Sequence, residues 1–315
     1  FNTKNGLLHA VDNVSFSIEE GRTLGVVGES GCGKSTLGRV VLHLLPATEG
    51  QILFCGEDIS NPKKAKLHEL RRNMQMVFQD PYSSLNPRQS VAEIIGEPLK
   101  VYHVCKSKQE LDERVREIMD TVGLPERYQH SYPHELDGGR RQRIGIGRAL
   151  ALNPKFIVCD EPVSALDVSI QAQILNLMMD LQEEKKLTYM FITHDLGVIA
   201  DMCDNIIVMY GGRICERGTA REIFYNPKHE YTKGLLRSIP NGNNMKKKLV
   251  PIAGTPINML NLPAGCAFCT RCDAAMKICL SEHPEEMAIN ENHRAACWIN
   301  VRDQLMNAEG GEQNV

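Results

Sequence analysis

The stretch from Gly28 to Thr36 constrains this chain more than any other part of its sequence. It reads Gly-Glu-Ser-Gly-Cys-Gly-Lys-Ser-Thr, with four residues between Gly28 and Gly33 and with Lys34 and Ser35 directly after them. This is the pattern of a phosphate-binding loop, or P-loop, in which backbone N–H groups curl around phosphates at the start of a helix. A short apolar strand is expected before it, at 23–27, and a helix after it. The sequence therefore predicts an α/β fold that binds a phosphate-bearing ligand.

Each residue type in the loop has a separate expected task. Lys34 is expected to reach the β- and γ-phosphates, and Ser35 to coordinate Mg²⁺. An ordinary glycine-rich turn is the alternative, and the strand and helix on either side argue against it. The other expected phosphate contacts are Gly28, Ser30, Gly31, Cys32, Gly33 and Thr36.

Charge and hydropathy limit the class of ligand and the cellular location that we expect. The net charge is −3 and 42% of residues are apolar, which suffices for a core but gives no general basic field. The phosphates are therefore expected to belong to a nucleotide, not to a nucleic acid. No apolar run is long enough to span a bilayer and no signal peptide opens the sequence, so we expect a cytosolic or peripheral protein. Because the sequence opens on Phe1 and not on Met, we expect its natural start to lie upstream.

The chain alternates between stretches that favour strands and stretches that favour helices. We expect residues 1–60 to be rich in strands, including 8–18 and 51–56, with another strand ending at 76–79. Helices are expected from about 80 to 153, one of them capped by Ser107 with Glu110 three residues later. Further strands are expected at 156–159 and 189–193, and a hairpin at 206–216 that turns on Gly211-Gly212.

An acidic pair follows the apolar run at 156–159. Asp160 and Glu161 stand at the carboxyl end of this expected parallel strand, where side chains face the ligand crevice of α/β sheets. Asp160 is suited to hold Mg²⁺ directly or through water, and Glu161 to polarise the water that attacks a phosphate. A structural role for two buried carboxylates without a metal would be costly.

A third motif brings a family into view. The run Leu136-Asp137-Gly138-Gly139-Arg140-Arg141-Gln142 resembles the signature motif of ABC-transporter ATPases. Other elements of that family follow in its order. They are Gln79 as the Q-loop glutamine, 164–167 as the D-loop with Asp167, and His194 as the switch histidine. Phe1 is expected in the place of the aromatic residue that stacks on adenine.

The resemblance implies a fold and a set of site roles. The fold is a P-loop NTPase with a RecA-like core, an antiparallel β subdomain and a helical subdomain. Gln79 would join the Mg²⁺ ligands, and His194 would contact the γ-phosphate. Asp137, Gly138, Gly139 and Asp167 would contact ATP across a dimer interface. The resemblance also implies an ATPase domain at 1–240 with a helical subdomain at about 80–153, and a Cys-rich extension at 256–302. From composition and position we expect a polar linker at 241–255 and a tail at 303–315 that is frayed from Asn307 onward.

Three further segments, 78–88, 229–236 and 262–266, resemble the ATPases of oligopeptide and dipeptide importers and of their nickel-importing relatives. The resemblance implies a Mg-dependent ATPase that pairs with a second, usually different, ATPase chain. Two membrane permeases, fed by an extracellular binding protein, would lie above the pair at the cytoplasmic face of the bacterial inner membrane. A soluble ABC ATPase of DNA repair or translation is the first alternative, but the chain has neither a coiled-coil insertion nor a second cassette. A non-hydrolysing regulatory sensor is the second, yet Glu161 and His194 are both present.

The signature departs from the family pattern at two positions. Asp137 stands where Ser is usual, and Arg140 where Gln is usual. Asp137 still suits a helix N-cap, but its charge opposes the phosphate of the ATP that it would face. We therefore expect the two ATP sites of the dimer to hydrolyse unequally, unless Arg140 and Arg141 offset the charge or Asp137 turns away.

Five of the eleven cysteines gather near the C-terminus, whereas the others are scattered in a manner that suits reduced thiols. The short segment cannot build a core alone, which suggests metal binding. The spacing of Cys266, Cys272, Cys279 and Cys297 resembles the four-cysteine pattern of the importer family, some members of which hold a [4Fe–4S] cluster. Cys269 is a potential substitute ligand. Zn²⁺ and free thiols or disulfides stay open as alternatives, and the role is expected to be structural and remote from ATP.

Overall fold

The computed structural model describes residues 2–3, 6–239 and 251–311, and it divides the chain into two compact units. The first unit comprises Phe1–Ser17, Leu24–Leu37 and Thr193–Val315, and the second comprises Ile18–Thr23 and Gly38–Ile192. Most of the linker expected at 241–255 lies outside the described residues, as does Phe1.

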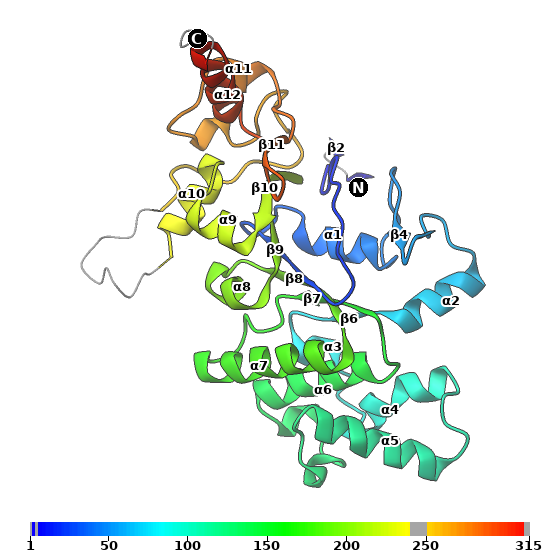
Figure 1. The fold of residues 1–315 in the computed structure, drawn as a ribbon. Helices are drawn as coiled ribbons and strands as arrows, with labels where there is room; N and C mark the ends of the chain where they lie inside the picture. Colours follow the sequence, from blue (N-terminus) through cyan, green and yellow to red (C-terminus); the bar gives the residue numbers. More distant parts are fainter. Residues whose placement is uncertain (1, 4–5, 240–250, 312–315) are drawn as a thin grey trace. The chain divides into compact units, whose positions relative to one another are not determined.

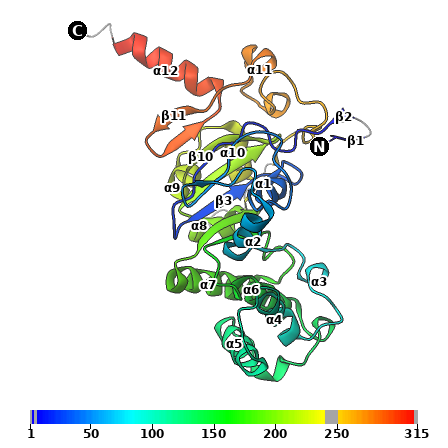
Figure 2. The ribbon, with the colours of Figure 1, turned by 90° about the vertical axis from the view of Figure 1, so that its right-hand side faces the viewer.

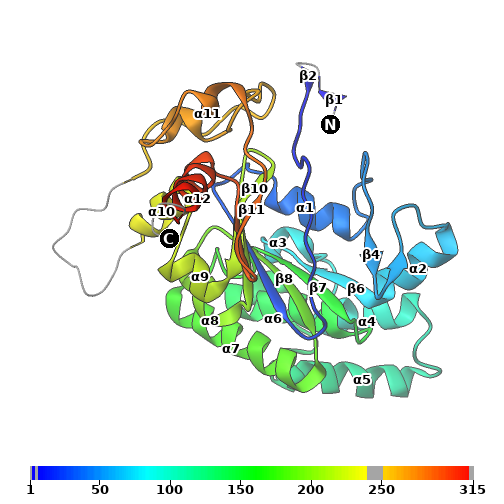
Figure 3. The ribbon, with the colours of Figure 1, turned by 45° about the horizontal axis from the view of Figure 1, so that its top comes forward.

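The first unit contains the P-loop strand and a run of mainly antiparallel strands. Strand β3 (Thr23–Val27) is fully buried and pairs in parallel with β9 (Asn205–Tyr210). From β9 the antiparallel pairing continues through β10 (Arg213–Thr219) and β12 (His293–Ala295) to β11 (Met287–Asn290). Figure 3 labels β10 and β11 in this part of the sheet. The predicted hairpin is confirmed, because Gly211 and Gly212 both have positive φ in the turn between β9 and β10.

Helix α1 (Lys34–Val41) follows the P-loop as predicted, whereas two other expectations for this unit are wrong. Residues 8–18 form no strand, because only a loose alternation of polar and apolar residues supported one. The tail is not frayed up to residue 311, since α12 (Trp298–Gly311) runs through it (Figure 2). The other elements of the unit are β1 (Asn2–Thr3), β2 (Gly6–Leu7), α8 (Leu196–Met202), α9 (Ala220–Tyr225), α10 (Glu230–Arg237), the 3₁₀ turn η4 (Cys269–Arg271) and α11 (Ile278–Ser281).

A buried carboxylate joins three segments of the first unit. Glu216 on β10 is 0% exposed and accepts hydrogen bonds from the backbone N–H groups of Lys228 (2.6 Å) and His229 (2.9 Å). A third partner is the His293 ring on β12, with Nε2 at 2.7 Å from Oε1. Burial alone would raise the pKa of Glu216, but these hydrogen bonds outweigh it and hold the pKa below the ordinary 4.5.

The second unit is built on three parallel strands with β7 (Phe156–Asp160) in the centre. Strand β6 (Met74–Val77) lies on one side and β8 (Thr188–Thr193) on the other. Every residue of β7 and β8 is buried, as their continuous apolar sequences predicted. The strand expected at 51–56 is shorter, since Gly56 has positive φ and turns the chain between β4 (Leu53–Phe54) and β5 (Glu57–Asp58).

Helices dominate the rest of the second unit, and Figure 1 shows α4 to α7 stacked in cyan to green. The sequence did not predict α2 in the charged stretch after residue 60, because its helical face carries few apolar residues. None of the helices in the described parts of the chain is long and apolar enough to cross a membrane. The bounds are α2 (Lys64–Asn73), α3 (Pro81–Ser84), α4 (Val91–Val101), α5 (Lys108–Thr121), α6 (Gly138–Leu150) and α7 (Val168–Lys185), with 3₁₀ turns η1 (Glu126–Tyr128) and η2 (Pro133–Glu135).

Helix α5 begins where its capping residue predicted, although the capping box is incomplete. Ser107 Oγ accepts the N–H of Glu110 at 3.1 Å, but the Glu110 carboxylate accepts the N–H of Lys106 and not that of Ser107. The apolar face of α5 packs against α4 and α6, and each fully buried aliphatic side chain stabilises this packing by about 1.5–3 kcal/mol. The buried residues of this small core include Ile94, Ile95, Leu99, Val115, Ile118, Met119 and Ile144.

Candidate functional site

At two positions of the P-loop, Gly28 and Gly33, the backbone conformation and the neighbouring atoms admit only glycine. Gly28 has φ +151°, and a Cβ there would lie 2.2 Å from the carbonyl oxygen of Met209. Gly33 has φ +106°, and a Cβ there would lie 2.0 Å from the carbonyl oxygen of Ala10. The loop is therefore pressed against neighbouring backbone at both glycines, and only glycine permits this approach.

Lys34 lies folded over its own loop. Its side chain is buried, and Nζ donates to the carbonyl oxygens of Gly28 (2.7 Å) and Glu29 (3.0 Å). A phosphate in the loop would compete for the same ammonium hydrogens with a full negative charge, which makes stronger hydrogen bonds than a carbonyl does. Burial raises the pKa of the Cys32 thiol, so the thiol is neutral. Cys32 therefore contributes its backbone N–H and its side-chain volume to the loop, but no charge.

The acidic pair and the Q-loop glutamine meet in the second unit. Asp160 is 2% exposed at the end of β7, and Arg39 Nη2 lies 3.9 Å from its Oδ2. Gln79 follows β6, and its Nε2 donates to Glu161 Oε2 at 2.8 Å. The structure therefore brings together Gln79 and Glu161, as the parallel pairing of β6 with β7 requires.

Glu161 has an unusual backbone for its residue type. Its φ is +47°, in the left-handed region where a non-glycine residue costs on the order of 1 kcal/mol or more. The N–H of Glu161 donates to the carbonyl oxygen of Ile192 at 2.8 Å, which fixes the residue next to β8. Strain of this kind gathers at functional sites.

The signature segment forms the start of α6, and the predicted N-cap is confirmed. Asp137 accepts the N–H of Arg140 at 2.8 Å, and the Arg140 guanidinium pairs with the same carboxylate. Arg141 takes no part in this pair, because its Nε donates to the carbonyl oxygen of Pro133 at 2.7 Å and its guanidinium lies over the Tyr82 ring. Of the two arginines that were expected to offset the Asp137 charge, the structure therefore assigns Arg140 alone.

The remaining signature and D-loop residues surround the start of α7. A Cβ on Gly139 would lie 2.6 Å from Ile170 Cγ2, so this glycine allows α6 and α7 to approach closely. Asp167 is exposed immediately before α7, and Gln171 Nε2 donates to the carbonyl oxygen of Leu166 in the D-loop at 2.9 Å.

The predicted switch histidine, His194, is exposed in the first unit directly after β8, before α8 begins.

A groove of about 800 Å³ opens beside Gln79 in the second unit. Its walls include Phe78, which is 37% exposed, and Val101 on α4, which is 57% exposed. Glu97 and Arg148 add opposite charges to the lining. The sequence does not reveal these wall residues, because Val101 simply continues the apolar pattern of a helix that is buried elsewhere.

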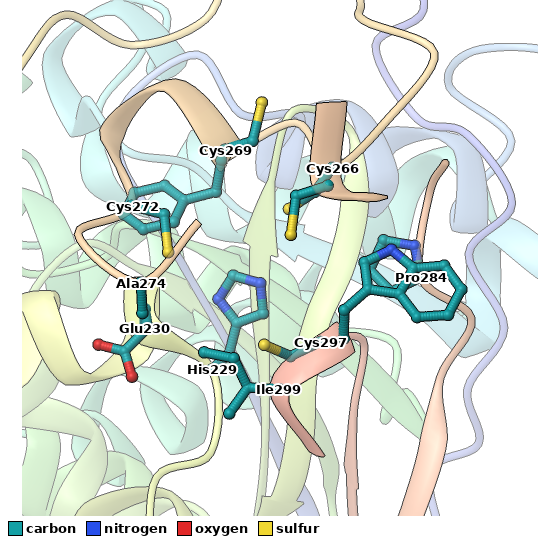
Figure 4. Close-up of a pocket in the computed structure, with 12 residues that line it drawn as sticks. His229, Glu230, Cys266, Cys269, Cys272, Ala274, Pro284, Cys297 and Ile299 are labelled. Carbon is teal, nitrogen blue, oxygen red and sulfur yellow. The ribbon is translucent and has the colours of Figure 1, made fainter. Parts of the chain in front are cut away.

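The Cys-rich segment of the first unit encloses a second cavity, with about 20 Å³ of free volume. All five C-terminal cysteines line it, together with His229 at the start of α10. Figure 4 shows the sulfurs of Cys266, Cys272 and Cys297 directed into the shared space and the sulfur of Cys269 directed away from it. All eleven cysteines of the chain are free thiols.

Burial shifts the pKa values of two groups that line this cavity, Cys266 and His229. Burial, with a smaller effect of the neighbouring thiols, raises the pKa of Cys266 to about 12. Burial lowers the pKa of His229 to about 4, and its Nδ1 accepts the N–H of Tyr231, which leaves the ring proton on Nε2. Within the described residues, no set of three or more His, Cys, Asp or Glu side chains is arranged to hold a single metal ion.

The expectation that the Cys-rich segment is remote from the ATP site is wrong. Arg271, which stands between Cys269 and Cys272, pairs with Glu29 inside the P-loop at 2.6 Å. This contact could not be predicted from the sequence, because a lone arginine in a cysteine-rich stretch has no preferred partner.

A P-loop between a buried strand and a helix, with an acidic pair and a capped signature helix, defines the ATP-binding cassette class of P-loop proteins. Two family models match the chain: "ABC transporter" over residues 11–164, and "Oligopeptide/dipeptide transporter, C-terminal region" over residues 215–279.

Known proteins agree with this class along nearly the whole chain. The oligopeptide transport ATP-binding protein AppF of Bacillus subtilis is 50% identical over 95% of this chain and 92% of its own length. The oligopeptide transport ATP-binding protein OppF of Salmonella typhimurium is 48% identical over 88% of this chain and 84% of its own. The cassette MJ0796, solved as a dimer with ADP and Pi, is 32% identical over 67% of this chain and 91% of its own, with a TM-score of 0.62. The chain belongs to the oligopeptide-transport family of ABC ATP-binding proteins.

Proposed function

We propose that this chain is the ATP-binding and ATP-hydrolysing subunit that powers an ABC importer of oligopeptides or dipeptides. The names of its relatives support the cargo class. The observation that carries hydrolysis, as distinct from binding alone, is the contact between Gln79 and the strained, fixed Glu161 beside the buried Asp160. A subunit that only sensed nucleotide would have no need of this arrangement.

The proposed roles follow from the chemistry of each side chain. Lys34 and the loop N–H groups bind the phosphates, and Glu161 accepts a proton from the attacking water while Gln79 orients it. The hydroxyl of Ser35, the amide of Gln79 and the carboxylate of Asp160 are oxygen donors, which suit Mg²⁺. When bound, Mg²⁺ neutralises charge on the β- and γ-phosphates. His194 contacts the γ-phosphate.

The assembly implied by this function has three kinds of partner. A second ATPase chain, different from this one, would complete the ATP site on this chain's P-loop with its own signature segment, and this chain's signature would complete the site on the partner's P-loop. Two permeases at the inner membrane would respond to the conformational changes of the ATPase pair. An extracellular binding protein would deliver cargo to these permeases. The groove beside Gln79 suits a short amphipathic helix of a permease at the cytoplasmic face, since its walls carry exposed apolar side chains and charges of both signs.

We further propose that the Cys-rich cavity holds a [4Fe–4S] cluster on Cys266, Cys272, Cys279 and Cys297. The donor set fits, because all five cysteines line one cavity and only the sulfur of Cys269 is seen to point away from it, which leaves the four proposed ligands (Figure 4). The free volume is that of about one water, so the thiols must move apart and lose their protons when they bind metal.

Metal analysis tests the cluster directly. Protein purified without oxygen should contain iron and acid-labile sulfide in equal amounts, and Cys272→Ser should lose both. The matched control is Cys269→Ser, which should keep them. Zinc alone, or no metal, would refute the cluster and leave the ATPase proposal untouched.

The cargo is tested in proteoliposomes that contain the complete transporter. ATP hydrolysis should rise when the binding protein carries a short peptide, and Lys34→Ala should abolish the rise. Stimulation by a nickel complex and not by peptides would overturn the proposed cargo class.

A further inference from the structure

Among the described residues, Arg271 is the only member of the Cys-rich segment that forms an ion pair with the P-loop. It ends the 3₁₀ turn η4, directly before Cys272. Its Nη1 lies 2.6 Å from Glu29 Oε2, and its Nη2 lies 3.0 Å from Glu29 Oε1. This is a two-pronged pairing of guanidinium and carboxylate, the strongest common geometry for such a pair.

The guanidinium is held in place by the segment that carries it. The Arg271 side chain is only 3% exposed, whereas that of Glu29 is 25% exposed. Nε donates to the carbonyl oxygen of Ala253 at 2.9 Å, and the guanidinium lies within 6 Å of the ring centres of Tyr210 and Phe268.

Glu29 in turn is fixed on three sides. Its N–H donates to the Tyr231 hydroxyl at 2.7 Å, its carbonyl oxygen accepts from Lys34 Nζ at 3.0 Å, and its carboxylate accepts from Arg271. The Tyr231 ring on α10 packs against Phe268 of the Cys-rich segment, with centres 5.3 Å apart. Glu29, near the start of the P-loop, is therefore held by contacts from both α10 and the Cys-rich segment.

We propose that Arg271 is a positioning residue for ATP binding, through which the folded state of the Cys-rich segment sets the shape of the P-loop. Loss of the Arg271 contact frees Glu29, whose carbonyl oxygen is one of the two that hold Lys34. Because Arg271 directly precedes Cys272, a change that opens the cysteine cavity acts on Glu29 through the same residue. The inference rests on the proposed ATP site and adds a control on it.

The test measures the affinity of the purified full chain for MgATP by calorimetry. Arg271→Gln and Glu29→Gln should each weaken binding roughly tenfold, within the range known for residues that act through a neighbour. The double variant should bind MgATP no more weakly than either single variant, because each single substitution already breaks the same Arg271–Glu29 contact. Arg271→Lys should recover part of the affinity, since it keeps the charge but only one prong. The control is Arg294→Gln, which changes an exposed arginine on β12 and should bind like the parent.

Further arms separate the inference from a general loss of folding. Glu29 is partly exposed, so Glu29→Gln should keep the parent's melting temperature within a few degrees and still lose affinity. Cys272→Ser should weaken MgATP binding in the parent but not in the Arg271→Gln variant. Parent-like affinity in both single variants, or losses that add in the double variant, would overturn the inference. Lys34→Ala should weaken MgATP binding by at least about tenfold in either case, and parent-like affinity in this variant would show that the ATP site itself is wrong.

Discussion

Replacing Asp137 by serine restores the usual signature residue and should speed ATP hydrolysis at one site of the dimer. That site combines the partner's P-loop with the signature of this chain. Serine is as good an N-cap as aspartate, so α6 should keep its start and the free energy of unfolding should change by about 0.5 kcal/mol or less. The effect on hydrolysis is therefore not expected to come from stability.

The magnitude follows from the charges around Asp137. At an effective dielectric of about 20, a carboxylate about 4 Å from one phosphate charge costs on the order of 4 kcal/mol. Arg140 pairs with this carboxylate, and the Asp137 side chain is 51% exposed. Arg140 and the solvent therefore screen much of the charge of Asp137. A remaining cost of about 1–3 kcal/mol corresponds to a rate change of roughly 5- to 150-fold at that site.

The assay uses the assembled transporter in a Glu161→Gln background, which silences the site built on this chain's own P-loop. The remaining hydrolysis should rise when Asp137→Ser is added. Asp137→Asn keeps an N-cap and the shape but removes the charge, and it should recover most of the same rise if charge is the cause. Unchanged hydrolysis in both variants would refute the electrostatic reasoning and leave Asp137 as a tolerated cap.

Two further predictions concern binding and stability. Lys34→Ala should weaken MgATP binding by at least about tenfold in calorimetry, because it removes the charged hydrogen bonds to the phosphates. The lowered pKa of Glu216 means that its stabilising contacts are complete above about pH 4.5 and are lost as the pH falls through the lower, folded value. Denaturant unfolding should therefore show a stability loss below about pH 4.5 that is absent in Glu216→Gln, which itself should be less stable by about 1–3 kcal/mol at pH 7. A mutant with the parent's pH dependence would contradict this reading of Glu216.

The sequence predicted the parts of the fold whose causes are local. The P-loop strand, β7, β8 and the β9–β10 hairpin each carry a pattern that admits one structure, such as two glycines where the turn needs positive φ. Asp137 and Ser107 cap helices because a side-chain oxygen at that position satisfies a free N–H. Helix α2 was missed because its face is mainly charged, and its position depends on packing and not on its own composition.

The candidate site divides in the same way. The P-loop and the acidic pair are motifs, and the family resemblance gives Gln79 and His194 their expected places. The contact of Gln79 with Glu161 follows from the parallel pairing of two strands, which sequence order suggests. The pair of Arg271 with Glu29 depends instead on how the Cys-rich segment folds back near the P-loop, and no local pattern encodes that distance.

The most direct test of the account is ATP hydrolysis by the assembled transporter that carries Glu161→Gln in this chain alone. The amide can still accept the Gln79 hydrogen bond, so the site should keep its shape and its affinity for MgATP. It can no longer take a proton from water, and loss of a general base typically slows a reaction by about 10²- to 10⁴-fold. The account predicts unchanged ATP binding, a stable ATP-bound dimer and the loss of most transport-coupled hydrolysis. Hydrolysis at the parent rate would contradict it.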